Sequence, residues 1–129
     1  MNQTLAEHHR RIASGIDEIR AFCSQPEPNV AALSNARVRL SRASGARTQY
    51  INETLIPELR ARADRSMLAE LAELQRVIAA KRLASSVHVS VWSSKAIAGD
   101  WRGYCQAARS IWAMMEEQMS RERRIFGSL

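Results

Sequence analysis

The fold is decided first by residues 4–23, TLAEHHRRIASGIDEIRAFC, where apolar side chains recur at intervals of three and four residues. This spacing is typical of one face of an α-helix, and Thr4 with Glu7 predicts a capping box at its start. The face is formed by Leu5, His9, Ile12, Ile16, Ile19 and Cys23. We therefore expect a helix that turns this face, including His9, toward helical partners.

A second helix is predicted after the prolines of residues 26–28, because proline cannot continue the first helix. Asn29 is a good N-cap residue for this second helix, which we expect to reach Ile56. Gly45 is a weak point within it, and Pro57 predicts a kink or a stop.

A third helix is predicted after Asp64, which is another plausible cap. The segment VHVSVW, residues 87–92, alternates with the period of a half-buried strand. Because a lone strand has no partner in this chain, we favour a continuation of the third helix into an irregular connector over a strand that pairs across a dimer. Gly99 and Asp100 begin a fourth helix, and Gly127 closes it.

Length and composition predict one all-α domain over residues 1–129. The chain has 46% apolar residues but only five glycines and three prolines, too few for a turn-dense β-protein. Four amphipathic helices with short connections most naturally form an up-down-up-down bundle. No apolar run approaches a membrane span, and the N-terminus has no apolar core of a secretion signal, so we expect a cytoplasmic protein without a membrane partner.

The charge and cysteine patterns narrow the function classes. The net charge is +6, and 17 arginines accompany two lysines, but the arginines are interleaved with acids along the chain. This interleaving favours solvated helix surfaces and disfavours nucleic acid as a partner, so a basic nucleic-acid-binding bundle stays an alternative only. Cys23 and Cys105 form no CxxC pair, which fits a reducing compartment. We expect them to be near neighbours as buried thiols, with a redox-switched disulfide as the alternative.

The bundle topology predicts which polar residues share one level. The first and fourth helices would be antiparallel neighbours, which places His9 beside Gln118 and Glu122. The end of the second helix would bring Gln49 and Glu53 to this level, and the third helix would bring Gln75. We therefore expect an interior polar network of Gln49, Gln75 and Gln118 around His9, Glu53 and Glu122.

The order of these motifs resembles the hemerythrin-like family, whose members are four-helix bundles with a non-heme di-iron centre. Residues 5–12, LAEHHRRI, look like the family's first-helix histidine motif, with His9 as the better match to the ligand. Similar runs of the second, third and fourth helices lie at 48–59, 71–78 and 118–126. The resemblance implies a hemerythrin-like bundle over most of the chain.

The chain departs from this family at the metal ligands. Where the family has histidines, the sequence has Gln49, Gln75 and Gln118, although Thr48 and Asn52 could instead fill the second-helix positions. A glutamine amide is a weak neutral ligand that cannot replace an imidazole at iron, so we expect the di-iron centre to be absent.

No catalytic signature is present, so we expect a non-enzymatic module without a cofactor that serves in sensing or protein interaction. Its partner would be an unidentified protein or a small ligand, held in a pocket at the level of His9. The alternative is a metal-binding or redox protein that holds a single ion through His9, Glu53 and Glu122. A buried carboxylate without a cation would recruit an arginine such as Arg42. The apolar connector at residues 89–92 could supply a homodimer contact.

Overall fold

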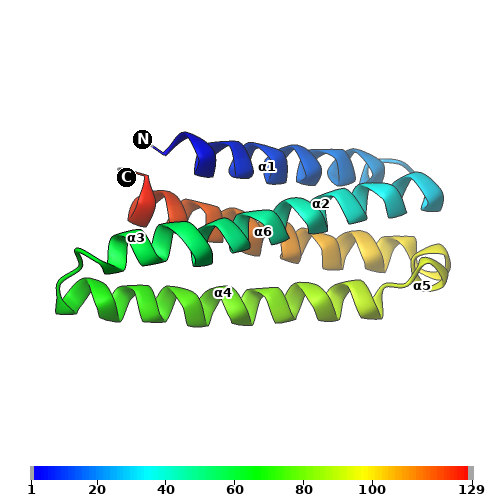
Figure 1. Ribbon diagram of the computed structural model, residues 1–129. Coiled ribbons are helices and arrows are strands. Elements are labelled where there is room, and N and C mark those ends of the chain that lie inside the picture. Colours follow the sequence, from blue (N-terminus) through cyan, green and yellow to red (C-terminus); the bar gives the residue numbers. More distant parts are fainter. Residues whose placement is uncertain (1, 128–129) are drawn as a thin grey trace.

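The computed structural model describes residues 2–127, and every regular element in that range is helical. The long helices lie side by side (Figure 1). The elements are α1 (Gln3–Cys23), α2 (Val30–Tyr50), a π-helical turn η1 (Ile51–Leu55), α3 (Ile56–Arg60), α4 (Arg65–Val91), α5 (Ser94–Gly99) and α6 (Trp101–Phe126). The all-α class is confirmed, and no helix among these residues combines the length and apolarity needed to cross a bilayer.

Short polar side chains cap the long helices. The side chain of Asn2 accepts a hydrogen bond from the Leu5 amide at 2.8 Å, so α1 begins before Thr4 and the capping box expected there is wrong. Asparagine satisfies an amide that has no partner within the helix, as the predicted box would have done. The other predicted caps are confirmed for α2, α4 and α6, at Asn29, Asp64 and Asp100.

The second helix continues past Pro57, so its expected end at Ile56 is wrong. In the turn η1 the Ile56 amide donates to the carbonyl of Ile51, five residues back. Proline lacks an amide hydrogen, and its ring collides with the carbonyl four residues before it in a regular α-helix. The wider π-helical turn accommodates this ring, and the chain stays helical to Arg60.

The segment 87–91 belongs to α4, which rules out the strand alternative. The helix ends at Val91, and the amide of its C-cap residue, Trp92, makes the last helical hydrogen bond to the carbonyl of His88 at 3.0 Å. Ser93 then caps the short helix α5, where we expected an irregular connector.

The interior consists of two apolar clusters separated by a polar layer. His9 lies between the two clusters on α1, Arg47 and Thr48 lie between them on α2, and Glu122 does so on α6. The α3-side cluster contains Leu5, Ile51, Leu55, Ile56, Leu71, Leu74, Ile78 and Phe126. The α5-side cluster contains Ile12, Ile16, Ile19, Leu33, Ala36, Leu40, Ile97, Tyr104, Cys105, Ala108, Trp112, Met115 and Met119.

Helix α4 covers only one of these clusters. Its buried side chains, Leu71, Leu74 and Ile78, all belong to the α3-side cluster. The next positions on the same face are Lys81, Ser85 and His88, which are polar and only partly buried. Because these side chains do not fill the interior, the α5-side cluster stays uncovered toward α4, and a pocket opens there.

Candidate functional site

Four polar side chains from three helices meet in the layer between the clusters. His9 comes from α1, Arg47 from α2, and Gln118 and Glu122 from successive turns of α6. Their exposed fractions are 6%, 5%, 2% and 0%, so all four are shielded from water. Helices α1 and α6 are held together at this end, where the Asn2 amide donates to the Gly127 carbonyl at 3.2 Å and the start of α1 lies beside the end of α6 (Figure 1).

The carboxylate of Glu122 is the centre of this group. The Nη1 of Arg47 donates to its Oε2 at 2.7 Å, and the Nε2 of Gln118 donates to the same oxygen at 3.0 Å. The Nε2 of His9 lies 2.8 Å from its Oε1, and since an ionised carboxylate only accepts, this nitrogen carries the proton. Arg47 also donates to the hydroxyl of Ser44 at 3.1 Å.

These partners keep Glu122 ionised although it is buried. Burial alone raises the pKa of a carboxyl group, because it disfavours the charged form. The hydrogen bonds from His9 and Gln118 and the positive charge of Arg47 outweigh burial and hold the pKa of Glu122 below its ordinary value. The group is thus a buried ion pair with two further hydrogen-bond donors.

The structure brings His9, Gln118 and Glu122 together as predicted, but not the remaining residues. Gln49 and Glu53 are exposed, and they contact each other at 3.2 Å. Gln75 is only partly buried and accepts a hydrogen bond from Arg60. The expected interior roles of Gln49, Gln75 and Glu53 are therefore wrong.

Two related expectations also need correction. The arginine that pairs with the buried carboxylate is Arg47, whereas Arg42 is exposed. His9, Glu53 and Glu122 do not converge on one point, because Glu53 lies on the surface. Within residues 2–127 no group of three or more His, Cys, Asp or Glu side chains is arranged to hold a metal ion.

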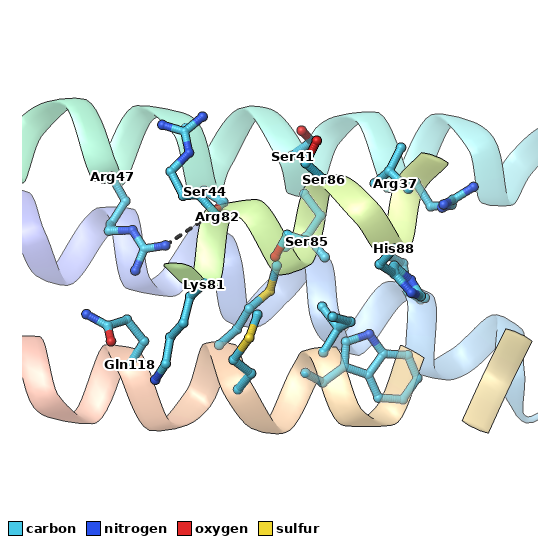
Figure 2. A pocket seen from close by; sticks show the side chains of 18 of the residues that line it. Arg37, Ser41, Ser44, Arg47, Lys81, Arg82, Ser85, Ser86, His88 and Gln118 are labelled. Atoms are coloured by element: carbon cyan, nitrogen blue, oxygen red, sulfur yellow. Dashed lines mark hydrogen bonds between the residues drawn. The ribbon is translucent and has the colours of Figure 1, made fainter. Parts of the chain in front are cut away.

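A pocket of about 450 Å³ adjoins the polar layer between α2, α4 and α6. Figure 2 shows Arg47 and Gln118 at one end of it and Arg37 and His88 toward the other. Apolar side chains contribute much of its wall, namely Ile19, Leu40, Ile78, Val89, Tyr104, Ile111, Trp112, Met114 and Met115. The five serines in the wall are Ser41, Ser44, Ser85, Ser86 and Ser90.

The charged groups in the wall are all cationic. Arg37, Arg47, Lys81 and Arg82 line the pocket, and none of its lining residues in the described part of the chain is an aspartate or glutamate. Arg47 is neutralised by Glu122, and Lys81 lies 3.8 Å from Glu117. Arg37 and Arg82 have no such ion pair with a carboxylate anywhere in residues 2–127. The pocket therefore combines apolar surface with two cations that are not neutralised.

The end near His88 is built on aromatic rings. The guanidinium of Arg37 lies 5.4 Å from the centre of the Tyr104 ring and donates to the Trp92 carbonyl at 2.7 Å. His88 stacks on the same tyrosine at 5.8 Å. Burial and the charge of Arg37 lower the pKa of His88, and burial raises that of Tyr104 to about 12. Both rings are thus uncharged at neutral pH.

The opposite end contains two buried polar atoms that lack a partner. Among residues 2–127, neither the Nε of Arg47 nor the Oε1 of Gln118 has a hydrogen-bond partner. Buried polar groups are nearly always paired, so each exception calls for an explanation. Sequence reasoning missed this pocket. The signal that could have indicated it is the change from leucine and isoleucine to lysine, serine and histidine along the inner face of α4.

Comparison of the chain with known protein families, with curated proteins and with solved structures finds no significant match.

Proposed function

We propose that this chain is a non-enzymatic binding module that takes up a small amphipathic anion in the pocket between α2, α4 and α6. The observation that carries the proposal is the lining of the pocket, where apolar side chains accompany Arg37 and Arg82 and no carboxylate of residues 2–127 neutralises these two cations. Ligand pockets in proteins are typically apolar with a few convergent polar groups. This pocket offers both features, and its cations select for negative charge.

We further propose that the chain is a hemerythrin-like up-down-up-down four-helix bundle that has lost its di-iron site. The supporting observation is the buried layer itself, in which His9 and Glu122 are retained on the first and last long helices. In this interpretation the guanidinium of Arg47 supplies the positive charge that a metal ion would otherwise supply to Glu122. Loss of the metal leaves a helical scaffold that is free to serve in sensing or interaction.

Ligand binding can be tested with two fluorescent probes of nearly the same aromatic framework. 1-Anilinonaphthalene-8-sulfonate is anionic, whereas N-phenyl-1-naphthylamine lacks the sulfonate. We expect the anionic probe to bind one site per chain and to bind more tightly than the neutral one. Replacement of the exposed Arg82 by glutamine should lower the affinity for the anionic probe by roughly twofold to fivefold, which is the usual size of an exposed charge interaction.

The matched control is Arg42→Gln, which removes the same charge from an exposed position of α2 outside the pocket. This variant should bind the anionic probe as the unmodified protein does. Equal weakening by Arg42→Gln and Arg82→Gln would attribute binding to net charge and would contradict a specific site.

Metal content tests the second part of the proposal. Protein prepared without chelators or a metal-binding tag should contain much less than two iron atoms per chain and show no absorption band of a di-iron centre. Metal near two atoms per chain would contradict the interpretation of Arg47 as the compensating cation.

A further inference from the structure

We propose that the ligand has two unlike ends, an anionic group near Arg37 and, at the end near Arg47 and Gln118, a neutral hydroxyl or primary amide. This inference rests on the proposed function, because it describes the ligand of the same pocket. It names the chemical class as a hydroxylated or carbamoylated carboxylate or similar anion.

The end near Arg47 and Gln118 offers one donor and one acceptor. Both side chains are more than nine-tenths buried, and both line the pocket. In the described part of the chain the Nε hydrogen of Arg47 and the Oε1 of Gln118 have no partner. The amide of Gln118 cannot be reversed without loss of contact, because its Nε2 donates to the carboxylate of Glu122.

This end is already balanced in charge, so it favours a neutral group. Glu122 lies 2.7 Å from Arg47 and neutralises it. A second anion at this point would lie beside Glu122 and repel it. Two further cations lie at this level of α4 (Figure 2): Lys81 is 3.8 Å from Glu117, and Arg82 is exposed, so solvent screens its charge.

A hydroxyl or a primary amide fits this pair because it both accepts and donates. Its oxygen would accept from the Nε of Arg47, and its hydrogen would be donated to the Oε1 of Gln118. A carboxylate or an ether has no hydrogen for the glutamine. Since both protein atoms are shielded from solvent, we expect a small rotation of these side chains to bring them to the ligand.

The anionic end belongs at Arg37, which lies at the opposite end of the pocket from Arg47 (Figure 2). Among residues 2–127 no carboxylate neutralises Arg37, and its Nη2 is buried without a partner. Arg37 and Arg47 are ten residues apart on α2, which corresponds to about 15 Å along the helix axis. An extended chain of roughly this length can contact both ends.

The test compares 12-hydroxydodecanoate with dodecanoate, which share the carboxylate and the chain and differ in the terminal hydroxyl. Isothermal titration calorimetry gives both affinities on the intact protein. We expect the hydroxy acid to bind about tenfold more tightly or better, because it satisfies two buried groups that dodecanoate leaves unpaired.

Two variants assign the preference to the named atoms. Gln118→Met removes the acceptor, and Arg47→Lys removes the Nε hydrogen while keeping a cation for Glu122. In each variant the ratio of the two affinities should fall below about threefold, because the hydroxyl loses one of its two partners. Arg42→Gln should retain the full preference.

The outcomes separate this inference from the proposed function. Equal affinity of the unmodified protein for both acids would overturn the inference and leave the anion-binding function standing. Binding of neither acid would overturn both. If circular dichroism shows that one variant does not fold, the other decides, and a preference that persists there would overturn the role of this pair.

Discussion

At the residue scale, Glu122 combines complete burial with a retained charge. Its carboxylate contacts His9, Arg47 and Gln118, each from a position fixed by a helix. A buried ion pair contributes little compared with apolar packing of the same volume, but removal of one partner leaves an uncompensated charge. Substitution of a single member should therefore lower stability by more than the intact group contributes to it.

Arg47→Met should destabilise the protein by about 3–5 kcal/mol, because Glu122 would remain buried without its cation. Urea unfolding followed by circular dichroism gives this value. The double variant Arg47→Met/Glu122→Met should recover most of the loss, and Arg42→Met, at an exposed position, should change stability by less than about 0.5 kcal/mol. A double variant as unstable as the single one would contradict the assignment of the penalty to an unpaired charge.

The same carboxylate predicts how stability depends on pH. The pKa of Glu122 is lower in the folded protein than in the unfolded chain, so folding favours its ionised form. This contribution is present above the unfolded pKa, about 4.3, and is lost as the pH falls through the folded value. Thermal unfolding between pH 7 and pH 3 should therefore show the gap between the unmodified protein and Glu122→Gln narrowing below about pH 4. A gap that widens with acid would contradict the direction of the pKa shift.

At the element scale, the pocket exists because α4 changes the character of its inner face partway along. The face is apolar at Leu71, Leu74 and Ile78 and becomes polar at Lys81, Ser85 and His88. The outer face shows the reverse, with Leu83, Val87 and Val91 exposed at 67%, 53% and 61%. An apolar residue on the inner face would continue the core, so the polar residues there keep the pocket open.

Ser85→Leu should place an apolar side chain in the middle of the pocket and obstruct it. We expect it to raise stability by about 1–2 kcal/mol, within the usual value of a buried leucine, and to abolish binding of 1-anilinonaphthalene-8-sulfonate. Chemical unfolding and probe fluorescence measure the two effects. Ala84→Leu, one residue away on the exposed surface and outside the pocket lining, should leave both unchanged. Full probe binding by the folded Ser85→Leu protein would place the probe elsewhere.

The contact between the end of α1 and the start of α6 predicts thiol reactivity. Burial and the neighbouring Cys105 thiol raise the pKa of Cys23 to about 12, so almost no thiolate is present at pH 8. We expect both thiols to react slowly with a disulfide reagent in the native protein and rapidly in denaturant. Cys23→Ser isolates the contribution of Cys105. Rapid labelling of the native protein would favour the redox-switch alternative.

At the scale of the whole molecule, the sequence predicted helix caps and other short-range features better than it predicted which face of a helix is buried or how closely two helices approach. Caps such as Asp64 and Asp100 are short-range signals, and the structure confirms them. The turn η1 requires a hydrogen bond across five residues, which no helical periodicity indicates. Gln49 and Glu53 were expected inside because a spacing of four residues fits any helix face, whereas Arg47 lies on the face that is buried. The pocket depends on how closely α4 approaches α2, a distance that sequence patterns do not encode.

Two partner expectations stay predictions at this scale. Val89 and Val91 of the expected dimer contact are exposed at 52% and 61%, and light scattering over a range of concentrations will show whether they associate. Titration with DNA and RNA at low salt tests the nucleic-acid alternative, which requires steeply salt-dependent binding.

The polar layer between the two apolar clusters also has a consequence for how fast the backbone amides on its two sides exchange their hydrogens with solvent. In the α3-side cluster, apolar side chains of α4 pack against those of residues 51–56 and enclose the backbone amides there. Those of the α5-side cluster border the pocket. Hydrogen exchange should therefore divide the molecule at the level of His9, with slower exchange on the α3 side and faster exchange on the side that admits the ligand.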